Sequence, residues 1–319
     1  MAAEAVTRIE KEKILIEVGA CAVTILPQFG GKVASIRVKG HELLQAPLVP
    51  YAPRTRTMSF DEGDASGWDE CLPSVANCTV KTVNGPVHVP DHGDIWRVEW
   101  KVLSSANGSL TMLAEGFSLP LALKRTITVA QTEMGYRLHA GYQVTNTGAT
   151  VTPWAWSAHP CYASETGDVV TLPGSIKTLR LEGSGGGRLG KGGVSVAWPM
   201  AKLVTGGETN LSIATPPETG TGDKLFAGPL AATENWVALE RPKAGVRLRV
   251  SFDPAATPYL GLWLCNGGWP DRPGTKQHCV AMEPTTAPVD SLGIEGSWSR
   301  SLAVGESFRW PMTLDLELL

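Results

Sequence analysis

Two ionisable residues of this sequence share a local setting in which each follows an apolar run and directly precedes a proline. His159 precedes Pro160, and Glu283 follows Cys279–Met282 and precedes Pro284. Because proline cannot donate to a sheet ladder, we interpret both positions as strand ends, where side chains from distant segments can converge. Histidine and glutamate have unperturbed pKa values of about 6.5 and 4.3, which suit proton transfer near neutral pH. For each residue alone, the simpler interpretation is a packed histidine or a solvated glutamate.

A third candidate is His92, which is followed by Gly93. Glycine permits a sharp backbone bend that would present the imidazole at a strand edge, although a histidine in an ordinary turn is the alternative. With His159 and Glu283, His92 would formally complete the two-histidine, one-carboxylate set of a metalloenzyme. These residues lie far apart in the sequence, without a local HxH or HExxH pair. We therefore expect no metal.

A glycine-rich stretch, residues 183–193, contains two patterns typical of nucleotide binding. Gly185, Gly187 and Gly190 satisfy GxGxxG, and the same stretch nearly satisfies the Walker pattern, but Gly192 stands where serine or threonine must hold the metal. Both patterns require a helix directly after the loop. The next residues are poor helix formers, so we interpret the stretch as a loop and expect no nucleotide.

Alternation of apolar and polar residues predicts the elements that would position these side chains. It is unbroken in Val246–Phe252 and in residues 312–318. It is less regular in three further segments, Lys32–Val38, Trp96–Trp100 and Tyr136–Ala140. Turn signals separate the strands at Asn84–Gly85, Asn107–Gly108 and Thr147–Gly148. Many short strands without a linker predict an all-β fold, a large antiparallel β-sandwich that forms a single domain over residues 1–319.

The composition excludes several classes of partner. The 319 residues are 43% hydrophobic and 18% charged, as in ordinary globular proteins. The net charge is −3 without a basic block, so we expect no nucleic acid. No apolar run reaches the roughly 20 residues of a membrane span, and we expect no membrane contact. Six sparse cysteines and an N-terminus without a signal-peptide pattern predict reduced, mostly buried thiols and a cytoplasmic location.

Taken together, the motifs resemble those of the aldose 1-epimerase (galactose mutarotase-like) family. His92–Gly93, His159–Pro160 and Glu283–Pro288 follow the family's order, and Gly222–Phe226 resembles its aspartate-containing substrate motif. The resemblance implies a large antiparallel β-sandwich whose cleft binds a monosaccharide. It also implies interconversion of the α and β anomers of that sugar without a cofactor.

The resemblance assigns a role to each residue. Glu283 would take the proton of the anomeric hydroxyl, and His159 would protonate the ring oxygen so that the ring opens. His92 would stabilise the developing charge, and Asp223 would lie in the sugar site. The alternative is a carbohydrate-binding protein on the same scaffold that has lost turnover.

The sequence departs from the family pattern where a Gly-Arg motif usually binds substrate hydroxyls. The corresponding region is Ser66–Ser74, which has no arginine. We expect Trp68 to stack on the sugar, and Asp69 or Glu70 to accept hydrogen bonds from its hydroxyls and to favour a neutral aldose. The alternative is that both carboxylates are solvated loop charges. A sugar phosphate would instead need a basic cluster, for which the candidates are Arg54, Arg56 and Lys224.

Overall fold

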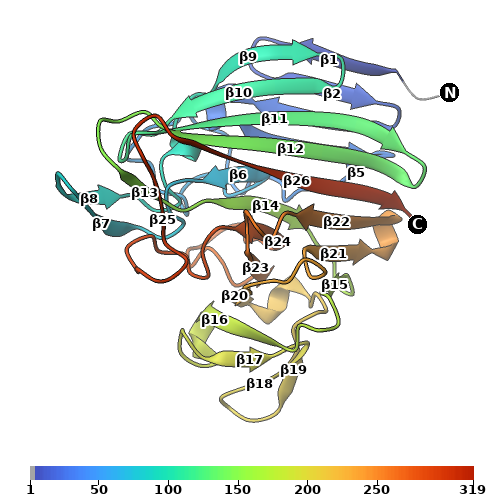
Figure 1. Cartoon of the computed structure of the whole chain (residues 1–319). Helices are drawn as coiled ribbons and strands as arrows, with labels where there is room; N and C mark the ends of the chain where they lie inside the picture. Colours follow the sequence, from blue (N-terminus) through green and yellow to red (C-terminus); the bar gives the residue numbers. More distant parts are fainter. Residues whose placement is uncertain (1–3) are drawn as a thin grey trace.

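The structure, a computed structural model, describes residues 4–319. Two large antiparallel sheets pack face to face, as Figure 1 shows. The larger sheet runs β1 (Ala5–Ile9), β2 (Ile14–Val18), β3 (Cys21–Leu26), β4 (Lys32–Val38), β6 (Trp68–Cys71), β14 (Ser157–Ala163), β24 (His278–Thr285), β23 (Tyr259–Asn266), β20 (Thr221–Ala227), β16 (Thr178–Ser184) and β17 (Ser195–Ala197), with β5 (His41–Glu42) paired to β4. This arrangement confirms the predicted all-β antiparallel sandwich.

The second sheet has eight strands. Its order is β15 (Val169–Thr171), β21 (Trp236–Arg241), β22 (Val246–Phe252), β26 (Ser307–Leu318), β12 (Gly135–Asn146), β11 (Leu121–Thr132), β10 (Ser109–Glu115) and β9 (Lys101–Ala106). Three small pairs complete the strands, β13 (Thr152–Trp154) with β25 (Arg300–Leu302), β18 (Met200–Lys202) with β19 (Glu208–Asn210), and β7 (Cys78–Thr82) with β8 (Gly85–Val89). Short 3₁₀ turns lie at Pro27–Phe29, Ile95–Arg97, Gly185–Gly187, Pro217–Thr219 and Pro242–Ala244.

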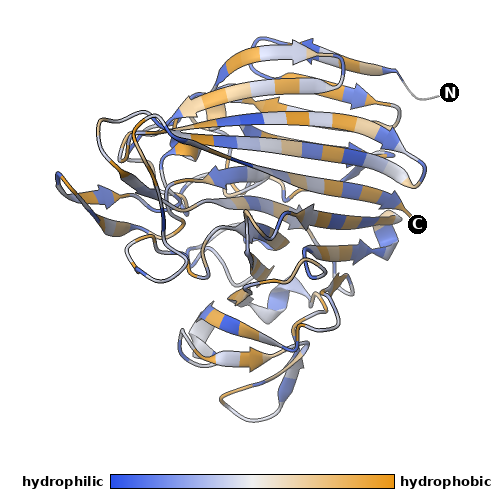
Figure 2. Ribbon diagram, viewed as in Figure 1, coloured by the Kyte–Doolittle hydropathy of each residue, from blue (hydrophilic) through white to orange (hydrophobic). Residues whose placement is uncertain are grey.

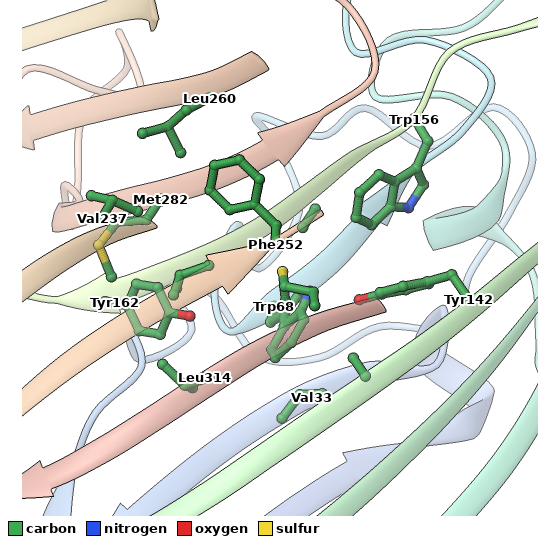
Figure 3. Packing of buried hydrophobic residues seen from close by; sticks show 14 of the residues in the cluster. Val33, Trp68, Tyr142, Trp156, Tyr162, Val237, Phe252, Leu260, Met282 and Leu314 are labelled. Atoms are coloured by element: carbon green, nitrogen blue, oxygen red, sulfur yellow. The ribbon is translucent and has the colours of Figure 1, made fainter. Parts of the chain in front are cut away.

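Side-chain alternation decides which face of each strand is buried. In β22 the apolar residues are buried and the residues between them are half-buried, and β26 alternates in the same way over its C-terminal half. Figure 2 shows this alternation of hydropathy along the long strands of the second sheet. The buried side chains meet those of the larger sheet in one extended hydrophobic cluster, part of which Figure 3 shows around Trp68, Tyr142, Trp156 and Leu314. That residues 1–319 form a single domain stays a prediction.

Two local predictions are wrong. Trp96–Trp100 is not a strand, because the chain turns through the 3₁₀ segment Ile95–Arg97 and buries both indoles, and Trp100 Nε1 donates to the Ile95 carbonyl at 3.0 Å. The prolines after His159 and Glu283 also do not end their strands. Pro160 pairs with Trp68, and Pro284 pairs with Leu260. Each proline removes one donor, and the ladder continues through the residues on either side.

The cysteines match the prediction of reduced thiols. All six are free, and all except Cys78 are buried. Within residues 4–319 no helix has the length and the apolar character needed to cross a membrane.

Candidate active site

The fold places the histidine and the glutamate opposite each other. The pairs Ser157–Thr285 and Cys161–Ala281 set the register of β14 against β24, so that His159 lies across from Glu283. Side chains of one strand alternate between the two faces of the sheet. Met282 belongs to the core between the sheets, so Glu283 and His159 point to the outer face. His159 Nε2 lies 4.0 Å from Glu283 Oε1.

Glu283 is buried but incompletely bonded. Its Oε2 pairs with the ammonium of Lys224, and its Oε1 has no hydrogen-bond partner among the described residues. On the neighbouring strand Gly261 faces Glu283, and a Cβ at Gly261 would lie 3.1 Å from Oε2. The glycine therefore provides the space that the carboxylate occupies.

His159 has a thiol on its other side. Its Nδ1 lies 3.6 Å from Cys161 Sγ, which belongs to a buried cluster with Cys265 and Cys279. Burial disfavours the imidazolium, but Cys161 and Glu283 outweigh burial and raise the pKa of His159 to about 9. A hydrogen bond with Cys279, together with His159, lowers the pKa of Cys161 to about 5 against the effect of burial. His159 therefore keeps its proton at neutral pH.

His92 reaches the same site from a bent loop. His92 has φ 56° and Gly93 has φ 70°, which confirms the sharp bend predicted there. The imidazole stacks on Phe60 with ring centroids 3.7 Å apart, and its centroid lies 5.2 Å from that of His159. Nδ1 is 2.7 Å from the Asp91 carboxylate. A non-glycine residue at positive φ is uncommon and costs conformational energy, which the contacts with Phe60 and Asp91 offset.

These side chains surround a cavity of about 500 Å³ on the outer face of the larger sheet. His92, His159 and Lys224 line it, together with residues 59–61 and 75–77. Glu283 lies directly beneath Lys224 and His159, with 0% of its surface exposed. A ligand in the cavity therefore reaches this carboxylate past those two side chains.

Two tryptophans of the cavity wall were missed from the sequence. Trp263 and Trp269 are half-buried and line the cavity, and Trp263 Nε1 donates to Gln277 Oε1 at 2.9 Å. Gly222 makes room for the first ring, because a Cβ there would lie 2.8 Å from it. The signal was present in β23, where leucines alternate with Trp263 and face the core. Because the leucines face the core, Trp263 lies on the outer face of the sheet. A large aromatic side chain in that position indicates a second surface that it covers.

The prediction that Trp68, Asp69 and Glu70 form a sugar platform is wrong. All three are at most 2% exposed, and none of them lines the cavity. Trp68 packs in the core, and Glu70 pairs there with Arg125 at 2.8 Å. Asp69 lies on the outer face but pairs with the buried Lys32. The strand β6 lies inside the sheet with both faces covered, so these carboxylates are not solvated loop charges either.

Asp223 is also outside the cavity. Neighbouring residues of a strand point to opposite faces, so Lys224 faces the cavity and Asp223 does not. Asp223 accepts from Ser184 Oγ at 2.7 Å and from Arg188 Nε at 3.2 Å, beside a separate cavity of about 200 Å³. Arg188 belongs to the glycine-rich stretch, which makes a short 3₁₀ turn and leads into a strand rather than a helix. That loop therefore lacks the helix that a nucleotide site would need.

The remaining candidates for binding phosphate or metal do not assemble a site. Arg54 is held by Asp64 at 2.9 Å, and the Arg56 guanidinium lies 5.1 Å from the Phe117 ring centroid. Among the lysine and arginine residues nominated from the sequence, Lys224 alone lines the cavity. Over residues 4–319, no three histidine, cysteine or carboxylate side chains are arranged to hold a metal ion.

Comparison with known proteins identifies the scaffold. No protein-family model and no curated protein matches the sequence. Solved structures do match, among them a galactose mutarotase-like protein from Lactobacillus casei ATCC 334, with 17% identity, a TM-score of 0.67, and coverage of 96% of this chain and 100% of that chain. The chain has the galactose mutarotase-like fold. A protein from Escherichia coli K12 with the provisional name aldose 1-epimerase matches at 18% identity and TM-score 0.66, over 94% of this chain and 97% of its own.

A third match shows the same scaffold over the full chain. The Slr1438 protein from Synechocystis sp. PCC 6803 is 14% identical, with a TM-score of 0.68, and the match covers 100% of this chain and 96% of that chain. At such identities the likeness concerns the galactose mutarotase-like fold alone. The chemistry of this chain depends on the residues of its own cavity.

Proposed function

We propose that this protein is an aldose 1-epimerase-like enzyme that interconverts the α and β anomers of a monosaccharide. The observation that carries the proposal is the pairing of His159, which lines a cavity with aromatic walls, with Glu283, which lies 4.0 Å away and beneath the lining. The two tryptophans, Trp263 and Trp269, offer apolar ring faces to the C–H groups of a sugar. The fold of the mutarotase-like proteins agrees with this proposal.

The reaction transfers two protons and breaks one bond. Glu283 Oε1, the carboxylate oxygen without a hydrogen bond, takes the proton of the anomeric hydroxyl. His159 Nε2 gives its proton to the ring oxygen as the bond between the ring oxygen and C1 breaks, which leaves an open-chain aldehyde. After rotation about the bond between C1 and C2, the ring closes on the other face and both protons return. Sugar and enzyme are then unchanged except for the configuration at C1.

The protonation states suit this sequence of steps. His159 has to begin as the acid, and the raised pKa, about 9, keeps it protonated at neutral pH. Glu283 is the base of these steps, and its Oε2 pairs with the ammonium of Lys224. Lysine is long and flexible, so a bound sugar can displace this ammonium and reach the carboxylate. His92, beside His159, is placed to hydrogen-bond the reacting end of the sugar.

The test uses freshly dissolved pure anomers. Polarimetry or NMR should show that catalytic amounts of the protein accelerate the approach to anomeric equilibrium for at least one aldose. The double variant His159→Ala, Glu283→Gln is the matched control and should lose the acceleration. Sugar binding without any acceleration would instead support a non-catalytic carbohydrate-binding protein.

The cytoplasmic location, the metal independence and the absence of nucleic-acid partners stay predictions from the sequence.

A further inference from the structure

Lys224 lies between two carboxylates at the cavity. Its ammonium pairs with Glu283 beneath the cavity and lies 3.6 Å from Oδ1 of Asp290 on the wall. Burial alone would lower the pKa of Lys224, but Asp290 and Glu283 outweigh burial and raise it. Lys224 is therefore a cation whose charge is already matched within the protein.

The main chain of Asp290, the carboxylate residue on the cavity wall, is held by hydrogen bonds. The Asp290 carbonyl accepts hydrogen bonds from the amides of Val75 at 3.0 Å and Ala76 at 2.8 Å, and from Ser74 Oγ at 3.1 Å. The Oδ1 atom of its side chain has no hydrogen-bond partner among the described residues. The contact with Lys224, at 3.6 Å, is longer than a hydrogen bond. The main chain of Asp290 is therefore fixed, its side chain lines the cavity, and its buried Oδ1 has unused acceptor capacity.

The charges around the cavity disfavour an anionic ligand. Asp61, Asp91 and Asp290 line it, and Glu283 lies beneath it. Within the part of the chain that the structure describes, Lys224 is the one lysine or arginine in the lining. A phosphate or a sugar carboxylate would have to compete with Glu283 and Asp290 for this ammonium while facing the other carboxylates. The other cation at the cavity, the imidazolium of His159, already lies 4.0 Å from Glu283.

We propose that Lys224 and Asp290 determine substrate specificity by binding two neighbouring hydroxyls of an uncharged aldose, so that sugar phosphates and sugar acids are rejected. This inference rests on the proposed function, because it concerns the substrate of the same cavity. A hydroxyl both donates and accepts, so one can donate to the Asp290 carboxylate while the next accepts from the Lys224 ammonium. Neighbouring hydroxyls of a sugar ring fit a cation and an anion that lie side by side.

The experiment compares an uncharged aldohexose with its 6-phosphate and its uronic acid. For the wild-type protein, we expect the uncharged sugar to have the lowest KM and the lowest Kd. Asp290→Asn removes one charge with little change of shape, and it should raise KM for the uncharged sugar about tenfold or more, with a smaller change in kcat. The preference over the 6-phosphate should fall by at least the same factor. Asp271→Asn, at an exposed position in the same C-terminal half, is the matched control for net charge.

Three outcomes would overturn the inference. One is a wild-type protein that binds the 6-phosphate or the uronic acid more tightly than the uncharged sugar, a result that needs no variant to fold. The second is an Asp290→Asn protein that, with unchanged thermal unfolding, keeps the wild-type KM. The third is an equal rise of KM for charged and uncharged sugars. Kd values measured by ligand-observed NMR separate this inference from the proposed function, since selective binding without mutarotation refutes only the latter.

Discussion

Two fully buried glutamates of the larger sheet, Glu70 and Glu283, have opposite surroundings. Glu70 accepts from Arg125 and Tyr142 at one oxygen and from Trp156 at the other, at 2.8 to 3.0 Å. Glu283 has one oxygen paired with Lys224 and the other without a hydrogen bond. Both side chains have 0% of their surface exposed, so burial does not distinguish them.

The difference lies in unused bonding capacity and in position. A buried carboxylate whose lone pairs are occupied contributes to the specificity of packing, whereas an unpaired buried acceptor costs about 1–3 kcal/mol. Glu70 lies between the sheets, and Glu283 lies under a cavity of about 500 Å³. A ligand can therefore complete the hydrogen bonding of Glu283 but not that of Glu70. This contrast predicts different consequences of the same substitution at the two positions.

The largest expected effect is on turnover in Glu283→Gln. The amide cannot take the anomeric proton, so kcat for mutarotation should fall by about 10²- to 10⁴-fold, the usual contribution of a positioned acid or base. Sugar binding, measured by NMR titration, should be affected less than turnover. A Glu283→Gln protein with wild-type kcat would remove Glu283 from the mechanism.

In Glu70→Gln the effect should appear in stability. Arg125 would remain as a buried cation without its counter-ion, and losing one partner of a buried pair costs about 3–5 kcal/mol. We expect this loss in the free energy of unfolding, measured by urea denaturation. For Glu283→Gln the loss should be smaller, since Lys224 keeps Asp290 as a partner. Equal losses for the two variants would end the distinction between a structural and a catalytic glutamate.

The pH profile should show the acid role of His159. The imidazolium is the acid, so on the basic side of the profile kcat/KM should fall as the pH rises through about 9. Cys161→Ala removes a group that raises this pKa, and the basic limb should move toward the ordinary value of about 6.5. The control is Cys265→Ala, which removes a thiol of the same cluster that is not bonded to His159. A basic limb that stays in place in Cys161→Ala would exclude Cys161 as the cause.

The smallest effect should come from Asp223→Asn. Asp223 binds Arg188 and Ser184 away from the main cavity. The KM and kcat of the Asp223→Asn variant should stay within experimental error of the wild-type values. Its free energy of unfolding should decrease, because the charged partner of Arg188 is lost. A selective rise of KM would show that the residue reaches the sugar after all, as the family resemblance implies.

Much of the fold could be predicted from local pattern. Alternation located β22 and β4 at their observed bounds, because strands with one buried face carry this signal in the sequence. The pattern was misleading in Trp96–Trp100, where a turn buries both indoles. Alternation gave no indication of β6, because both faces of this strand are covered and all four of its residues are buried.

The site could be predicted only in part, because charge pairing is set by distant residues. Two histidine-containing motifs and one glutamate-containing motif were found by their local context, and the structure brings all three together. Nothing near Asp69 in the sequence shows that Lys32 will neutralise it, and nothing near Glu70 indicates Arg125. Likewise, Asp290 is recognisable as part of the cavity only when β20 places Lys224 beside it.

At Gly261 the site is sensitive to a small, uncharged substitution. A methyl group there would lie 3.1 Å from Oε2 and 3.3 Å from Cβ of Glu283, and 3.4 Å from the ring of Phe226. A one-nucleotide change from a glycine codon to an alanine codon would therefore press on the carboxylate without altering any charged residue. The ionisable motifs alone therefore do not define the geometry of this site, because an uncharged residue on the neighbouring strand sets the room that the carboxylate has.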